Sequence, residues 1–139
     1  MRSFESIEKF FHSVPINRFL GYTLESCEAD AAVISMPPRS EYLQEGKSVQ
    51  GGIVSALADT AAAYSVIATL PPGMTTTGVE FKVSFLRAAK LEKGVLRAAG
   101  RVLRRGRNLA VCEVVVSQRD IDVAVALFTF LYLPLPTPS

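Results

Sequence analysis

Histidine and cysteine are scarce in this chain of 139 residues, which has one histidine and two cysteines. His12 lies in a short amphipathic segment, so no Ser-His-Asp or Cys-His catalytic arrangement is expected. One histidine and two separated cysteines offer no ligand cluster for a metal such as zinc. Cys27 and Cys112 form no CxxC pair, and we expect both to be reduced core residues. Any catalysis must therefore use carboxylates, amides and backbone groups.

A secretory signal is also lacking, because the start MRSFESIEKFF has neither an apolar core nor a small-residue cleavage site. We therefore expect a cytoplasmic protein. The stretch 51–70 is apolar enough to suggest a membrane span, but Asp59 near its centre would cost roughly 2.5 to 3.5 kcal/mol there. We expect it instead to form a helix buried in a soluble protein.

Charge is nearly balanced overall, at +2, but the basic residues are concentrated between positions 87 and 107. One interpretation is that they cover solvated strand faces and turns. The other is that they bind an anionic ligand, such as a phosphorylated cofactor. Against a single acid, Glu92, this segment holds Arg87, Lys90, Lys93, Arg97, Arg101, Arg104, Arg105 and Arg107.

Hydrophobic periodicity gives the order of elements. The pattern predicts a short amphipathic helix over 4–13 that ends at Pro15, and a hairpin over 21–36. A long helix is predicted to open at Gly51-Gly52 and to stop at Pro71-Pro72-Gly73. Alternating apolar residues in TTTGVEFKVSFLR indicate a strand with one buried face. Three more strands are predicted over 94–103, 109–118 and 123–133.

This order predicts one α+β domain over residues 1–139, with a curved antiparallel sheet packed against the buried long helix. Residues 1–14 would form its N-terminal helix segment and 134–139 a frayed tail. No repeat and no linker is visible in the sequence.

Asp59 is the one carboxylate in the apolar stretch VQGGIVSALADTAAAYSVIATL. A buried charge without a partner costs several kcal/mol, so packing or chemistry must compensate it. Gly51 and Gly52 place free N–H groups at the positive end of the helix, where they could hold a developing oxyanion. Gln44 and Gln50 add amides before the helix. The same residues also fit a purely structural interpretation, in which Asp59 is a satisfied polar group and the glycines form a tight turn.

Three stretches carry a family resemblance: VQGGIVSALADTAAAYS, TTTGVEFKVSFLRAAK and GRVLRRGRNLAVCEVVV. Together they resemble the hotdog-fold acyl-CoA thioesterases of the phenylacetate-degradation type, over about residues 20–133. The resemblance implies a hotdog fold, a curved antiparallel sheet wrapped around a long central helix. It also implies hydrolysis of a thioester to a free acid and coenzyme A.

Residue roles follow from the same resemblance. Gly51 would donate the oxyanion-hole N–H, and Asp59 would be the general base for water or the nucleophile. Gln44 would orient substrate or water. The family commonly has HGG where this chain has Gln50-Gly51-Gly52, and Gly78 stands where a hydroxyl residue is usual, with Thr77 as a neighbouring substitute. Residues expected to contact substrate are Gln50, Gly52, Thr77, Gly78, Arg105 and Arg107, the two arginines pairing with coenzyme A phosphates.

Family members build this site between two chains, so the resemblance implies at least a homodimer, and a homotetramer made of two such dimers. Coenzyme A would be part of the substrate, with no separate cofactor and no metal. Neither a membrane nor a nucleic-acid partner is expected.

Three alternatives stay open at this point. A non-catalytic module that binds or senses acyl-CoA would keep the pocket without turnover. A hotdog dehydratase or hydratase would pair a carboxylate with a histidine, and none lies near Asp59 in the sequence. A nucleic-acid module would use the basic segment, which lacks interleaved aromatics for stacking.

Overall fold

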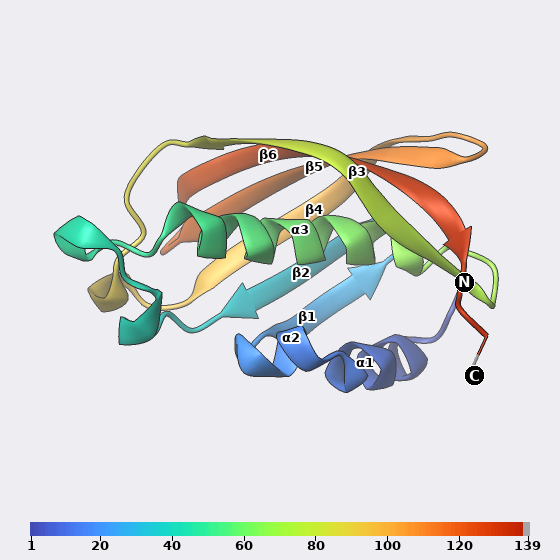
Figure 1. Cartoon of the computed structure of the whole chain (residues 1–139), viewed down its shortest axis with the longest axis horizontal. Helices are drawn as coiled ribbons and strands as arrows, with labels where there is room; N and C mark the ends of the chain where they lie inside the picture. Colours follow the sequence, from blue (N-terminus) through green and yellow to red (C-terminus); the bar gives the residue numbers. More distant parts are fainter. Residues whose placement is uncertain (138–139) are drawn as a thin grey trace.

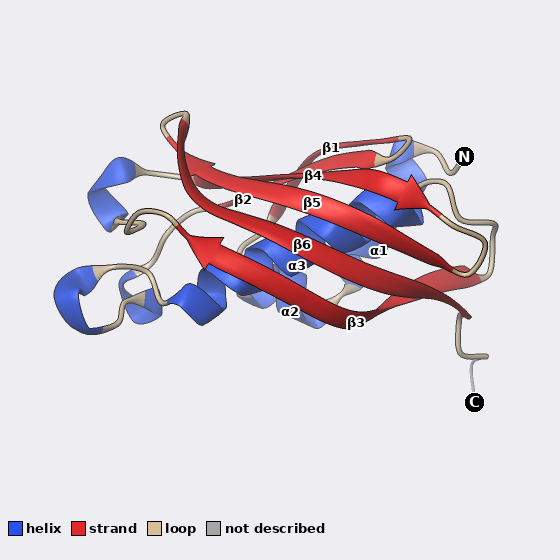
Figure 2. Cartoon of the chain, turned by 90° about the horizontal axis from the view of Figure 1, so that it is seen from above, coloured by secondary structure: helices blue, strands red, loops and turns tan. Residues whose placement is uncertain are grey.

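Six antiparallel strands form one sheet in the order β1-β2-β4-β5-β6-β3, and the sheet curves around a single long helix (Figure 1 and Figure 2). The computed structural model describes residues 1–137. The strands are β1 (Thr23–Glu28), β2 (Ala31–Met36), β3 (Met74–Phe85), β4 (Leu96–Arg105), β5 (Leu109–Gln118) and β6 (Ile121–Pro134). The helices are α1 (Phe4–Ser13), α2 (Pro15–Phe19) and α3 (Gly51–Ile67), with 3-10 turns η1 (Ser40–Tyr42), η2 (Glu45–Lys47) and η3 (Leu91–Lys93). This arrangement is the α+β hotdog fold that the resemblance implied.

The N-terminal segment differs from the sequence prediction at Pro15. Helix α1 begins after Ser3, whose side chain accepts a hydrogen bond from the Ser6 N–H, and it ends at Ser13. Pro15 then opens the separate short helix α2 instead of only ending α1. Proline is favoured in the first turn of a helix, because its fixed φ fits and its missing N–H needs no partner there.

Helix α3 is 17 residues long and crosses the concave face of the sheet, packing mainly on β4, β2 and β5. Its residues Leu57, Ala58 and Ala61 are fully buried, as expected of an apolar helix that a sheet surrounds. Helix and sheet lie close together at Gly100 of β4, where an added Cβ would be 2.6 Å from the backbone oxygen of Ala61. Small residues on both elements therefore set the short distance between helix and sheet.

Strand β3 forms one edge of the sheet, paired on one side only, with β6. The sequence predicted one buried face for it, but Val79, Phe81 and Phe85 each expose half or more of their surface. The prediction was wrong for the single chain because α3 packs mainly on β4, β2 and β5 and covers β3 only in part. An exposed, apolar edge strand is a ready surface for association with another chain.

The C-terminal end of the chain continues the sheet further than the sequence suggested. Pro134 still belongs to β6, and the Leu135 N–H donates to the Gly73 carbonyl at 2.7 Å. Of the predicted tail, residues 138–139 lie outside the described part of the chain. Within residues 1–137, no helix combines the length and apolar character needed to cross a membrane.

Candidate active site

The start of α3 carries two free backbone donors. Gln50 is the N-cap and its side chain makes no capping hydrogen bond, while its carbonyl accepts from the Ile53 and Val54 N–H groups. The N–H groups of Gly51 and Gly52 belong to the first turn, where no helical carbonyl precedes them. Within the described residues neither has an acceptor, so both remain available for an anionic oxygen at the positive end of the helix.

A hollow of about 510 Å³ opens at this helix start, and we call it the Gly51 hollow. Gln44 and Gly51 both line it, together with Phe85 of β3. The Gln44 side chain donates to the Ser48 hydroxyl at 3.2 Å, which leaves its amide oxygen free to accept. The structure therefore brings together two of the three predicted catalytic residues.

Gly51 lies in close contact with the Phe85 side chain. A Cβ added there would lie 2.9 Å from Cζ of Phe85, within the range that real Cβ atoms essentially never show. The exposed Phe85 ring is the group that would have to move. Phe85 was missed as a site residue by sequence reasoning, which assigned it only to the apolar face of a strand.

Asp59 lies two turns further along α3 and opens into a different space, the Asp59 hollow of about 450 Å³. This hollow is lined by Asp59, Gly78, Val79, Glu80, Phe81 and Phe128. Contrary to the sequence expectation, Asp59 is an exposed residue of the single chain. Within residues 1–137 its carboxylate has no hydrogen bond or ion pair.

Although Asp59 is exposed to solvent, the surrounding protein removes part of the water around its carboxyl group and so changes its pKa. Desolvation by burial raises the pKa of Asp59 above its ordinary value of 3.8. A carboxylate with a raised pKa is a stronger base than an ordinary one, which suits a group that must accept a proton from water.

The raised pKa also predicts a stability effect for Asp59→Asn. A carboxyl group whose pKa is higher in the folded than in the unfolded chain lowers stability once the pH passes above the folded value. Asp59→Asn should therefore unfold at a higher temperature than the unaltered protein at neutral pH. The difference should shrink as the pH falls through the raised pKa and should vanish below the ordinary carboxyl pKa, and thermal melts across a pH series would measure it. Equal melting temperatures at neutral pH would contradict this electrostatic account.

A single chain keeps Asp59 apart from Gly51. Eight residues of α-helix separate them, a rise of about 12 Å at 1.5 Å per residue. Each residue lines its own hollow, and neither of these two hollows contains both. Gly78, predicted to contact substrate, lies with Asp59, and Thr77 precedes it as an exposed residue of β3.

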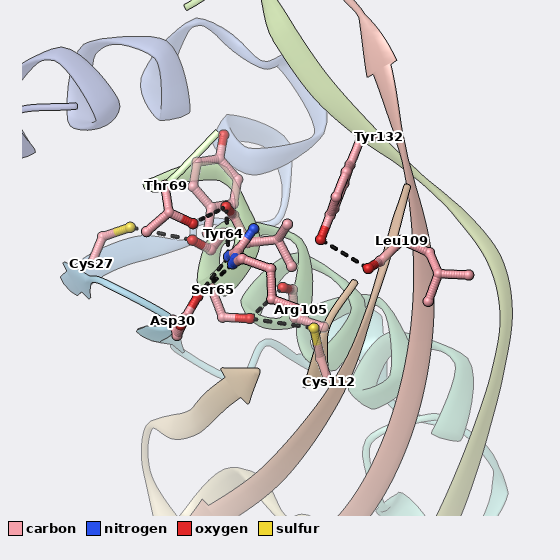
Figure 3. A network of polar contacts seen from close by, with 11 residues as sticks. Cys27, Asp30, Tyr64, Ser65, Thr69, Arg105, Leu109, Cys112 and Tyr132 are labelled. Atoms are coloured by element: carbon pink, nitrogen blue, oxygen red, sulfur yellow. Dashed lines mark hydrogen bonds and ion pairs between the residues drawn. The ribbon is translucent and has the colours of Figure 1, made fainter. Parts of the chain in front are cut away.

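Arg105 and Arg107 lie at the opposite end of α3 from Gly51. The Arg105 guanidinium donates to Asp30 at 2.6 Å and to the Val66 carbonyl at 3.3 Å, at the last turn of the helix (Figure 3). Its charge is thus already compensated by a carboxylate and the negative helix end. Arg107 is exposed in the turn between β4 and β5. The structure does not bring these two arginines to either hollow.

The predicted core cysteines lie near Arg105 in the same view. Both are buried and free, as the sequence predicted. Cys27 contacts the Tyr64 carbonyl at 3.3 Å, and Cys112 contacts the Ser65 hydroxyl at 3.6 Å. Burial raises the pKa of Cys27 to about 11, so its thiol stays protonated at neutral pH.

Comparison with known proteins shows the family of this chain. Residues 46–125, more than half of the chain, match the family profile described as Thioesterase superfamily. A phenylacetic acid degradation-related protein from Ralstonia eutropha JMP134 is 31% identical, with a TM-score of 0.80 over 85% of this chain and 90% of that one.

Two further solved structures share the fold at lower identity. A thioesterase family protein from Silicibacter pomeroyi has a TM-score of 0.87 at 24% identity, covering 94% of this chain and 97% of that one. The PaaI protein of E. coli, from its phenylacetic acid degradation operon, has a TM-score of 0.86 at 21% identity, with 95% of each chain covered. With its sheet wrapped around α3 and its profile match, this chain belongs to the thioesterase superfamily and is a thioester hydrolase of the hotdog fold.

Proposed function

We propose that this protein hydrolyses acyl-CoA thioesters at a site built from two copies of the chain. One copy would supply the start of α3, with Gly51 and Gln44, and the other would supply Asp59. The observation that carries the proposal is the separation of these groups along one helix, beside an uncovered apolar edge strand. Since chemistry needs them within hydrogen-bond reach of one substrate, a second copy is the simplest source of the missing half.

Water and these protein groups account for every bond and proton of the hydrolysis. As general base, Asp59 takes a proton from water while the water oxygen bonds to the thioester carbonyl carbon. The carbonyl oxygen becomes an oxyanion that the Gly51 N–H stabilises, aided by the helix end. The C–S bond then breaks, and the proton held by Asp59 goes to the departing thiolate.

A direct attack by Asp59 is the other route that its position allows. Its oxygen would form an anhydride with the acyl group and expel the thiolate, and water would then hydrolyse the anhydride. Both routes need an ionised carboxylate, and both leave Gln44 to orient the substrate or the water. The substrate carries coenzyme A, and the scheme uses neither a separate cofactor nor a metal. A cytoplasmic location and a tetramer of two such dimers fit the scheme and belong to the proposal.

Thiol release from a panel of short-chain, medium-chain, long-chain and aryl acyl-CoAs tests the proposal. We expect release from at least one class, with the matching oxygen ester turned over more slowly. A folded protein that binds acyl-CoA and releases no thiol from any of them would instead be a binding module.

A further inference from the structure

The Gly51 hollow has one wall that the proposed reaction does not use. Phe85, the last residue of β3, lines this hollow and exposes 55% of its surface. The far edge of its ring points at the helix start, where a Cβ added to Gly51 would lie 2.9 Å from Cζ and 3.3 Å from both Cε atoms. Because a Cβ and the backbone nitrogen are bonded to the same Cα, the ring edge lies beside the Gly51 N–H, the expected oxyanion donor.

Packing within the chain does not account for this ring. Phe81 lies four residues earlier on the same face of β3, and it stacks on Phe128 with 5.1 Å between the ring centroids. Phe85 stacks on no aromatic ring within residues 1–137. An exposed phenylalanine by itself means little. This one lies against a backbone donor at the mouth of a hollow, so contact with a bound molecule is the role that its position favours.

Backbone hydrogen bonds fix both sides of the gap between Phe85 and the helix start. On the strand side, the Leu86 N–H donates to the Val123 carbonyl at 2.9 Å. On the helix side, the Val49 N–H donates to the Ala89 carbonyl at 2.8 Å, which ties the residues before α3 to the segment after β3. The width of the gap is therefore set by the fold, and rotation of the Phe85 side chain is the simplest way to change it.

The other walls of the hollow define what the gap can hold. Val54 and Val123 line it and each expose only 3% of their surface, so its inner wall is apolar. In a thioester whose oxygen accepts the Gly51 N–H, the sulfur and the α-carbon are each two bonds from that oxygen. Of these two atoms only the α-carbon can carry a branch. A branch at the α-carbon is therefore the substituent that the Phe85 ring would meet.

We propose that Phe85 is a specificity-determining residue that selects thioesters with an unbranched α-carbon. The inference rests on the proposed function, because it places the thioester oxygen on the Gly51 N–H. A CH₂ group at the α-carbon fits beside the flat ring, whereas an added methyl group there needs the space that the ring edge occupies. Branches further along the acyl chain lie beyond the gap and are accepted.

The test uses three variants at Phe85 and one control. Phe85→Ala removes the ring, Phe85→Leu shortens the side chain with less loss of packing, and Phe85→Tyr keeps the ring. Phe19→Ala is the matched control, because Phe19 is 72% exposed in α2 and lines neither the Gly51 hollow nor the Asp59 hollow.

Each protein is assayed on the straight-chain acyl-CoA that the unaltered protein hydrolyses fastest, and on the same acyl-CoA with one methyl group added at carbon 2 or at carbon 3. Binding is measured by calorimetry with the matching ketone analogues, in which a CH₂ group replaces the sulfur and prevents hydrolysis. Size-exclusion chromatography compares the oligomeric state of the variants with that of the unaltered protein.

We expect the unaltered protein to prefer the 3-methyl over the 2-methyl substrate by roughly tenfold or more in kcat/KM, as for one methyl group in a tight pocket. Phe85→Ala should reduce this preference to about twofold or less, with Phe85→Leu between the two, because the added methyl group then has room. Phe85→Tyr and Phe19→Ala should keep it. The ketone analogues should bind in the same order.

Other outcomes would overturn the inference in distinguishable ways. Equal activity of the unaltered protein on the 2-methyl and 3-methyl substrates would show that the α-carbon is not selected. Equal losses of Phe85→Ala on all three substrates, with a weakened oligomer, would mean that Phe85 only supports contact between copies. If no thioester is hydrolysed but the ketone analogues show the selection and Phe85→Ala removes it, the proposed function fails while the role of Phe85 stands. Absence of both hydrolysis and ketone binding would overturn both.

Discussion

Asp59→Asn should reduce thiol release from acyl-CoA by roughly 100- to 10,000-fold, the range for removal of a general base or acid. The amide has nearly the shape of the carboxylate but cannot accept a proton from water or attack a carbonyl at neutral pH. Because the pKa of Asp59 is raised, activity of the unaltered protein should fall on acidification at a pH above the ordinary carboxyl range. Steady-state kinetics over a pH series would measure both effects.

Glu80→Gln is the matched control, since Glu80 lines the same hollow as Asp59 and the substitution removes the same negative charge. The Glu80 carboxylate faces the Thr129 hydroxyl at 3.4 Å, and we assign it no step in the reaction. Glu80→Gln should lose far less thiol-releasing activity than Asp59→Asn. If the folded Asp59→Asn protein kept the original rate, neither role proposed for Asp59 could be correct.

Removing the Gly51 N–H should lower kcat by roughly 100- to 1,000-fold, as for loss of one oxyanion-hole donor. Gly51→Pro deletes this donor at a position where proline is compatible with the helix. Gln50 already has φ −57° and ψ 137°, the extended backbone that a following proline requires. Gly51→Ala keeps the N–H and adds a Cβ against Phe85, so it separates the steric effect from the loss of the donor.

Mixing the two inactive variants gives the sharpest test of a shared site. If Gly51 of one chain works with Asp59 of its partner, co-expressed Gly51→Pro and Asp59→Asn chains will form some sites with both groups intact. Random pairing of equal amounts should restore about a quarter of the activity of the unaltered protein. Thiol release from the co-purified mixture would measure the recovery.

The contrary result is equally clear. A mixture as inactive as its separate components, with mixed oligomers present by mass spectrometry, would place the whole site within one chain. The substrate would then have to reach from the Gly51 hollow to Asp59 along a single helix, against the geometry of the two hollows.

Most elements followed from local patterns. The apolar stretch bounded by Gly51 and Pro71 predicted α3, alternating residues predicted β3, and extended segments between turns predicted the last three strands, with β5 at its observed bounds. The helix boundary at Pro15 was harder to predict, because a proline can both end one helix and start another. The resemblance supplied the roles of Gly51 and Asp59, and these remain predictions that the experiments above test.

The exposure of Asp59 and of β3 could not be predicted from the sequence. Periodicity tells which residues share a face, but not which part of a sheet a helix covers. Phe81 and Phe85 alternate like core residues, yet they lie on an edge strand that α3 covers only in part. In the same way, the eight basic residues look alike in sequence, and only their partners divide them into paired and unpaired cations.

The sequence by itself determined the element order, the apolar central helix and the glycine pair at its start, because helix and strand periods and proline and glycine stops are local properties. Only the tertiary structure decided that Asp59 and Gly51 line different hollows, that Arg105 is bound by Asp30, and that Arg87 lines the same hollow as Gly51. These relations join residues far apart in the chain, and they are fixed by strand order and by the packing of α3 on the sheet.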